Sequence, residues 1–341
     1  MTYLIAAPPP TPNGDLHLGH LSGPYLGADI FKRLLKQRGI NTYYSVSTDD
    51  NQSYVEKTAI KLSVDAGDLL RDSRAKIAKT LEVYSIDVDC FGKQESSYEE
   101  FVKNFFSDLY KFKQISICEV DVLYDRIEKS YPVEAFVTGY CPHCFDVTCG
   151  GICETCGHPN SGVDLLGIDR RRYEIRKEQR LVLDIESMHQ KISDHLQKIN
   201  SHHRPALEKL LDSLLSKSLD PFILSYKIGT GIDAEFIDLK DQQINVWGEM
   251  YPGHMYFFGK EKGYISPDNH YVQFLGFDNS YFYTLVHLSL AIAARESGYD
   301  WPLPSAFITN QFYNLEANKF STSKGHLIWA RNLARDIILI S

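Results

Sequence analysis

Two histidines lie three residues apart in a segment that suits contact with phosphate. The segment is Pro12-Asn13-Gly14-Asp15-Leu16-His17-Leu18-Gly19-His20. At the start of a helix, residues i and i+3 share one face, and the helix N-terminus presents free N–H groups and a positive dipole end. We expect His17 and His20 to donate hydrogen bonds to phosphate oxygens, with Gly19 leaving room for a nucleotide. Two ordinary surface histidines are the alternative.

A second polar segment, near the other end of the chain, combines cations, hydroxyls and glycine. Its sequence is Lys319-Phe320-Ser321-Thr322-Ser323-Lys324-Gly325. Ammonium groups and hydroxyls on a glycine-containing loop suit a clamp that closes on pyrophosphate. Alone, such a segment is most often a solvated surface loop, so the interpretation depends on its combination with the histidine segment.

Four of the seven cysteines form two C-x-x-C pairs, separated by eight residues. These four are Cys141, Cys144, Cys153 and Cys156. Paired C-x-x-C turns bring four thiolates into the tetrahedral arrangement that zinc prefers, and four cysteines leave no open coordination position. We therefore predict a structural Zn²⁺ site; a redox dithiol pair or disulfides are the alternative. Cys149 is either an alternative ligand or a spectator, and His143 and His158 are expected to lie outside the ligand set.

The elements that must position these segments follow an α/β pattern. Residues 3–7 form a short apolar run typical of a buried strand, and the Pro-rich segment 8–14 is a stiff loop. Helical spacing of apolar residues follows over 18–35, Gly39 fits a helix stop, and 41–46 is a second strand. A strand–loop–helix–strand unit of this kind begins doubly wound parallel, Rossmann-like domains that bind nucleotides.

The rest of the chain predicts one nucleotide-binding domain interrupted by an insertion. Residues 1–116 form its first half, 117–220 an inserted connective domain with the zinc knuckle, and 221–341 its second half. The basic run 170–180 either contacts an RNA backbone or forms a solvated face with i, i+4 ion pairs. Within the second half, a helix is expected over 285–294, and strands are expected at 222–226, 243–247, 271–276 and 306–309.

Composition sets outer limits on these interpretations. The 341 residues include 36 Lys plus Arg and 44 Asp plus Glu, for a net charge of −8, and 43% are hydrophobic. These values fit globular domains and exclude a disordered, collagen-like or coiled-coil chain. We expect no membrane partner, because no apolar run approaches the roughly 20 residues of a membrane span. The N-terminus lacks a secretory signal pattern, so the cytoplasm is the expected location.

The two phosphate-binding segments, in this order, resemble the signature pair of the class I aminoacyl-tRNA synthetases, called HIGH and KMSKS. Residues 17–20 match the first motif, and 319–323 match the second at four positions if Phe320 is allowed for Met. Thr322 stands where the family has a second lysine, which helps to stabilise the transition state of adenylate formation. Lys324, two residues further on, is a candidate substitute.

A zinc knuckle inserted in a class I catalytic domain makes the chain similar to the methionyl-tRNA synthetases. The resemblance implies activation of an amino acid by ATP with Mg²⁺, followed by transfer to the acceptor end of a tRNA. The implied catalytic residues are His17, His20, Lys319 and Lys324. The implied ATP-binding residues are Asn13, Gly19, Gly276, Asp278, Ser321 and Ser323. The implied amino-acid-binding residues are Pro10, Thr11, Asp50, Trp247 and Tyr283.

The chain departs from this family in its expected amino-acid pocket. Thr11 takes the place of a pocket tyrosine, or that tyrosine has no counterpart in this chain, and Tyr283 takes the place of a pocket histidine. One methylene or hydroxyl changes selectivity by about 1–3 kcal/mol, so methionine is the leading substrate and another amino acid is the alternative. A synthetase-like enzyme with a non-tRNA acceptor, and a catalytically silent nucleotide- or RNA-binding paralogue, are the alternative functions.

The end of the chain also bears on this resemblance. Residues 337–340 form an apolar run that stops abruptly, and the helical anticodon-binding domain of methionyl-tRNA synthetases would follow the second signature. We expect either a truncated chain or a shortened synthetase-like enzyme. The pattern assigns no oligomeric state.

Overall fold

The computed structural model describes residues 1–260, 265–315, 318–320 and 326–333, of which 315, 318 and 319 are described by their backbone alone. The chain divides into two units. The first comprises Met1–Gln94, His254–Phe277 and Pro304–Ser341, and the second comprises Glu95–Gly253 and Asp278–Leu303. The predicted boundaries after residues 116 and 220 stay a prediction.

A five-stranded sheet with the order β14-β13-β1-β2-β3 forms the centre of the first unit, and all its strand pairs are parallel. The strands are β1 (Tyr3–Ala6), β2 (Thr42–Val46), β3 (Cys90–Phe91), β13 (His270–Gly276) and β14 (Pro304–Asn310). The strand order reverses direction at β1, which pairs with both β2 and β13. The fold is therefore the doubly wound, Rossmann-like α/β arrangement that the sequence predicts.

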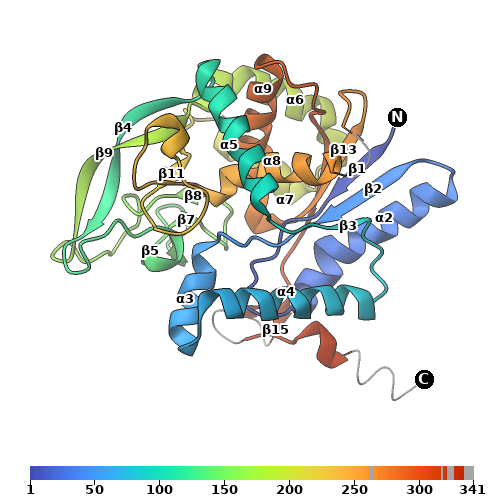
Figure 1. The fold of residues 1–341 in the computed structure, drawn as a ribbon, viewed down its shortest axis with the longest axis horizontal. Helices are drawn as coiled ribbons and strands as arrows, with labels where there is room; N and C mark the ends of the chain where they lie inside the picture. The colour runs from blue at the N-terminus through green and yellow to red at the C-terminus, as the bar shows by residue number, and fades with distance from the viewer. Residues whose placement is uncertain (261–264, 316–317, 321–325, 334–341) are drawn as a thin grey trace. The chain divides into compact units, whose positions relative to one another are not determined.

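The first helical segment is kinked, whereas the sequence predicts one continuous helix over 18–35. Gly23 has non-helical backbone angles, and Pro24 has no N–H to donate. The segment is therefore split into three, and α2 packs beside β1 and β2 (Figure 1). Gly39, with a φ of +70°, follows the end of this helical segment, as predicted. The helices between β1 and β3 are α1 (Leu18–His20), η1 (Leu21–Tyr25), α2 (Leu26–Gln37), α3 (Ser53–Leu62) and α4 (Ala66–Val83).

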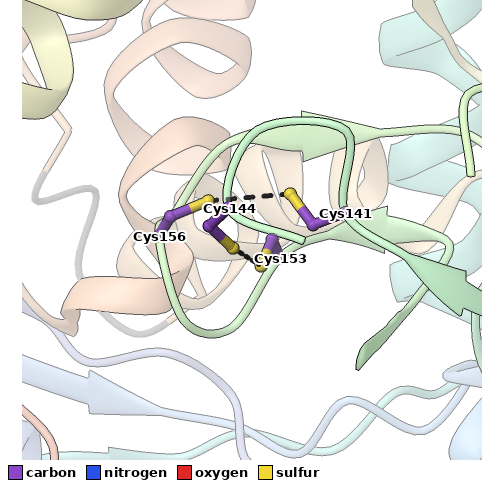
Figure 2. Close-up of side chains that lie close together, drawn as sticks. All are labelled: Cys141, Cys144, Cys153 and Cys156. Carbon is purple, nitrogen blue, oxygen red and sulfur yellow. Dashed lines mark hydrogen bonds between the residues drawn. The ribbon is translucent and has the colours of Figure 1, made fainter. Parts of the chain in front are cut away.

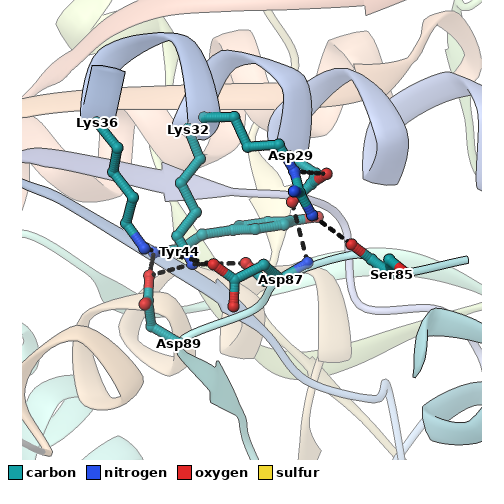
Figure 3. Close-up of polar contacts among 8 residues, drawn as sticks. Asp29, Lys32, Lys36, Tyr44, Ser85, Asp87 and Asp89 are labelled. Atoms are coloured by element: carbon teal, nitrogen blue, oxygen red, sulfur yellow. Dashed lines mark hydrogen bonds and ion pairs between the residues drawn. The ribbon is translucent and has the colours of Figure 1, made fainter. Parts of the chain in front are cut away.

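A buried lysine on α2 holds the chain that leads into β3. Lys32 is fully buried, and its Nζ lies 2.9 Å from carboxylate oxygens of both Asp87 and Asp89. Asp89 also accepts the Tyr44 N–H at 2.7 Å, and Asp29 on α2 accepts the Asp87 N–H at 2.9 Å (Figure 3). This cluster fixes α2 against the sheet, away from the signature segments.

The second unit combines a long antiparallel β-ribbon with helices and four short knuckle strands. β4 (Ser116–Asp125) pairs along its whole length with β9 (Tyr173–Leu183), which also pairs with β10 (Phe222–Ile223). The knuckle strands are β5 (Thr138–Tyr140), β6 (Val147–Cys149), β7 (Gly151–Ile152) and β8 (Pro159–Asn160). The other elements are α5 (Ser96–Lys111), α6 (His189–Ile199), α7 (Pro205–Leu215), β11 (Ser225–Tyr226), β12 (Gln243–Ile244), η7 (Phe282–His287) and α9 (Leu288–Glu296).

Two details of this unit differ from the sequence predictions. The expected strand 243–247 ends early, because Asn245 accepts the Trp247 N–H and α8 (Val246–Gly259) begins there. Residues 173–180 of the basic run lie on strand β9 and residues 170–172 precede it, so the expected i, i+4 ion pairs are wrong. Arg176 instead pairs with Glu174, two residues away on the same face of the strand. In the described part of the chain, no helix is long and apolar enough to cross a membrane.

Candidate functional site

The candidate residues of the first unit follow the carboxyl ends of neighbouring parallel strands. Pro10, Thr11 and Asn13 lie in the loop after β1, Asp50 follows β2, and Gly276 is the last residue of β13. Ligands of open α/β sheets bind at this edge, where the strand order reverses. The loops are themselves connected, because the carbonyl of Pro10 accepts the N–H of Asp49 at 3.1 Å.

The two signature histidines form a stacked pair at the start of α1. Their ring centroids lie 3.5 Å apart with the planes 15° from parallel. His17 caps the helix, since its Nδ1 accepts the backbone N–H of His20 at 3.1 Å. A neutral His17 ring must therefore carry its proton on Nε2, which is then the atom that can donate to an oxyanion. The predicted shared face of the two histidines is confirmed.

The second signature reaches this histidine pair through Phe320. The Phe320 ring meets the His17 ring edge-on, with centroids 5.7 Å apart and planes at 85°. A Cβ at Gly19 would lie 3.1 Å from the His17 ring, which it would crowd, and 3.7 Å from Phe320, in ordinary contact. Two segments from opposite ends of the sequence are thus packed together at one site.

Backbone hydrogen bonds join the chain on the far side of the second signature to the first. Leu18 donates to Ile328 O at 2.9 Å, and Ala330 donates to Leu16 O at 2.9 Å. The candidates Ser321, Ser323 and Lys324, together with Thr322 and the apolar segment 337–340, lie outside the described residues. Lys319 belongs to β16 (Asn318–Lys319), which pairs with β15 (Asn314–Leu315).

Asp50 is a largely buried carboxylate with partners that orient it. Its Oδ1 accepts from the Thr48 hydroxyl at 2.5 Å, and its Oδ2 lies 4.0 Å from Arg74 Nη1. Burial raises the pKa of the Asp50 carboxyl, against the opposing effects of Thr48, Arg74 and Lys93. A carboxylate held in this way can accept hydrogen bonds from an ammonium group.

Arg74 was not predicted from the sequence, although it anchors the Asp50 segment. Its guanidinium donates to the Thr48 hydroxyl and to the carbonyl of Gly92, and it lies 4.8 Å from the centre of the Phe91 ring. The position is on α4, a helix with no motif of its own. Only the tertiary fold brings Arg74 to Asp50, so no local signal could have identified it.

In the second unit, Trp247 is held on three sides. Its ring stacks on Phe282 with centroids 3.8 Å apart and planes 7° from parallel. The indole N–H donates to the buried Glu134 carboxylate at 2.7 Å, and the Trp247 carbonyl lies 2.8 Å from Nε2 of His287. Tyr283, fully buried, packs its ring 4.5 Å from that of His287. The sequence pattern does not predict Glu134 as a partner of Trp247.

Glu134 and Phe282 also line a cavity of about 640 Å³ within the second unit. Its wall includes Arg180 and residues of the cysteine-rich knuckle, but neither Trp247 nor Tyr283. Asp278 is in the 3₁₀ turn η6 (Phe277–Asn279), directly after β13.

The four predicted cysteine ligands converge on one point. Figure 2 shows their side chains directed toward one another from two loops. All four sulfur atoms lie within 4.8 Å of one another, with Cys141–Cys156 at 3.8 Å and Cys144–Cys153 at 3.6 Å. This sulfur-only set could hold a metal ion. Cys149 is outside it, with its sulfur 3.8 Å from the Thr138 hydroxyl, and the rings of His143 and His158 stack on each other.

Comparison with known proteins identifies relatives along nearly the whole chain. The family model described as "tRNA synthetases class I (M)" matches residues 3–339. Methionine–tRNA ligase of Pyrobaculum islandicum is 27% identical over 342 residues, which cover 96% of this chain and 60% of the relative. Methionine–tRNA ligase of Parabacteroides distasonis is 25% identical and is matched over 50% of its length. The chain thus spans about half to three fifths of the length of these relatives.

A solved structure supports the same architecture. Mycobacterium tuberculosis methionyl-tRNA synthetase in complex with methionyl-adenylate matches 98% of this chain and 62% of its own, with a TM-score of 0.74 at 16% identity. At this identity the likeness concerns the fold.

Proposed function

Because the chain belongs to the class I tRNA synthetase family of type M, we propose that it activates an amino acid with ATP and transfers it to tRNA, with methionine as the substrate. The observation that carries this proposal is the packing of Phe320, from the second signature, on the ring of His17, from the first. The two segments expected to contact the phosphates of ATP therefore meet at the carboxyl edge of a nucleotide-binding sheet.

The proposed reaction needs little covalent chemistry from the protein. The amino-acid carboxylate attacks the α-phosphate, and pyrophosphate leaves with magnesium. His17 and His20 donate to the phosphate oxygens as their charge grows, next to the N–H groups at the start of α1. Lys319, Lys324, Ser321 and Ser323 hold the leaving group in this proposal. Asn13, Gly19, Gly276 and Asp278 contact the nucleotide.

The amino acid is held, in this proposal, by its charged end and by its side chain. Asp50, oriented by Thr48, accepts from the ammonium group. Pro10, Thr11 and Trp247 contact the side chain in this proposal, whereas Tyr283, fully buried against His287, supports the site without touching the substrate. The stacking of Trp247 on Phe282 supports an aromatic surface in the second unit that suits an unbranched thioether.

We propose that the four-cysteine cluster holds zinc with a structural role. Cys141, Cys144, Cys153 and Cys156 would supply all four ligands, and zinc would staple a segment that has few apolar residues. Burial raises the pKa of the Cys153 and Cys156 thiols, and bound zinc would offset this effect by stabilising their thiolate forms. Free thiols elsewhere in the chain fit a reducing compartment such as the cytoplasm.

Methionine-dependent exchange of pyrophosphate into ATP tests the activation step, and charging of total tRNA tests the acceptor. Exchange with charging supports the full proposal. Exchange without charging indicates a different acceptor. ATP binding without exchange indicates a silent paralogue, which Thr322 in place of the family's lysine favours. In that case, restored exchange in Thr322→Lys would locate the defect.

A further inference from the structure

Asp15 is a buried carboxylate that contacts three separate parts of the first unit. Its side chain is 7% exposed. The Oδ1 atom accepts the N–H of Leu16 at 2.8 Å and the hydroxyl of Thr80, on α4, at 2.7 Å. The Oδ2 atom accepts from Nε of Arg331 at 2.6 Å. Asp15 thus connects the start of the first signature to a helix and to the chain beyond the second signature.

The α4 helix and its C-cap residue contact Asp15 and the residue that precedes Arg331. Thr80 holds Asp15, and Tyr84, the C-cap of α4, donates its hydroxyl to the carbonyl of Ala330 at 2.6 Å. Residues four apart lie on the same side of a helix, so one side of α4 contacts both segments. Arg74, on the same helix, holds the Asp50 segment.

We propose that Asp15 and Arg331 are positioning residues, which keep the chain after the second signature in register with the first. The register is the pair of backbone hydrogen bonds from Leu18 to Ile328 and from Ala330 to Leu16. A charge-assisted hydrogen bond to a buried carboxylate is strong, and its loss leaves that carboxylate without its cation. The catalytic consequence rests on the proposed function: displaced phosphate-binding groups slow the chemical step.

Two variants break the pair with little change of shape. Asp15→Asn keeps an oxygen for Leu16 and Thr80 but removes the charge that attracts Arg331. Arg331→Gln removes the cation. Arg33→Gln is the matched control, because Arg33 makes an equivalent Nε to carboxylate contact with Asp29, at 2.7 Å, within the Lys32 cluster away from the signatures.

Hydrogen exchange of the amides of Leu18 and Ala330, measured without substrates, tests the register directly. We expect both amides to exchange at least tenfold faster in Asp15→Asn and Arg331→Gln, and at the wild-type rate in Arg33→Gln. Unchanged protection in the two pair variants, or equal loss in the control, would overturn the proposal. Hydrogen exchange can be measured even if the wild type shows no pyrophosphate exchange. Such an absence of activity would contradict the proposed function but not the structural role of the pair.

The kinetic measurement separates positioning from general stability. We expect kcat of pyrophosphate exchange to fall about 10- to 100-fold in each pair variant, with the KM for the amino acid little changed. The double variant should be no slower than the slower single variant, because both substitutions remove one interaction. A rise in the amino-acid KM with constant kcat, or full additivity, would contradict a positioning role.

Discussion

His17 and His20 are a coupled pair, since one ring caps the helix through the backbone of the other and the two rings stack. The cap fixes which nitrogen of His17 can donate, and the stack fixes the orientation of both rings. His20 is half-buried and contributes no side-chain cap to the following helix. Its side chain can therefore be removed with less structural effect than that of His17.

His20→Ala should lower the rate of pyrophosphate exchange about 100- to 1000-fold, the usual effect of removing one donor to a developing oxyanion. The melting temperature should stay near that of the wild type. His270→Ala is the control, because His270 starts β13 and stacks on Tyr3 at the opposite end of the strand. Unfolding of the His20 variant would show that the residue is structural.

Asp50→Asn should raise the amino-acid KM about 10- to 100-fold, by loss of a charged hydrogen bond to the ammonium group. The wild-type KM should also rise as the pH falls through the pKa of Asp50, which burial places above its ordinary value.

The raised pKa of Asp50 means that the ionised carboxylate destabilises the native state, and that this cost disappears as the pH falls. The free energy of unfolding of the wild type should therefore rise, relative to that of Asp50→Asn, as the pH falls. Urea titrations of both proteins at several pH values measure this difference. The same pH dependence in both proteins would contradict this sign.

At the scale of single elements, the cysteine-rich loops offer an internal comparison. Cys153→Ser should abolish stoichiometric zinc and destabilise the segment 141–156, whereas Cys149→Ser should retain the metal, because Cys149 lies outside the sulfur cluster. Zinc content and melting curves before and after chelation measure both effects. An unchanged melting curve after complete removal of zinc would contradict a structural metal.

The α2 helix depends on its buried lysine. Lys32→Met should lower the free energy of unfolding by about 2–3 kcal/mol, since it leaves Asp87 and Asp89 without their shared cation. Lys36→Met is the matched control: Lys36 is half-exposed and contacts Asp87 at 3.3 Å, so its loss should cost under about 1 kcal/mol. Urea unfolding measures the free energy of unfolding of both variants. Equal losses would contradict the conclusion that the burial of Lys32 makes its ion pairs more important than that of Lys36.

The elements also show which structural features can be predicted from local sequence patterns. Strand–loop–helix order, the stop at Gly39 and the cysteine spacing are local features, and the structure confirms all three. The kink lies at Gly23 and Pro24, which the spacing of apolar residues does not take into account. The strand conformation of 173–180 depends on pairing with β4, a long-range contact that periodicity alone could not predict.

The same division applies to the site. The histidine pair and the second signature are compact motifs, recognisable by residue type and order. Arg74 and Arg331 belong to no motif, and Asp15 lies inside the histidine segment without being one of its recognisable residues. The role of each is visible only from a partner that is distant in sequence. Residues of compact motifs are therefore easier to predict than residues whose role depends on tertiary contacts.

At the scale of the whole molecule, a doubly wound parallel sheet and a four-cysteine cluster occur in a chain whose relatives include methionine–tRNA ligases. The central claim is that the two signatures of this chain form one site that makes an aminoacyl-adenylate. The proximity of Phe320 and His17, and the backbone bonds from 16–18 to 328–330, support it.

Pyrophosphate exchange into ATP, measured with the zinc-loaded protein against each of the 20 amino acids in turn, tests this claim most directly. The account predicts exchange that depends on methionine and exceeds that with any other amino acid, and that falls in His20→Ala. Selective exchange with another amino acid would show that this amino acid is the substrate, and it would still support the assignment of the site. No exchange with any amino acid, in a protein that is folded and contains zinc, would contradict the account.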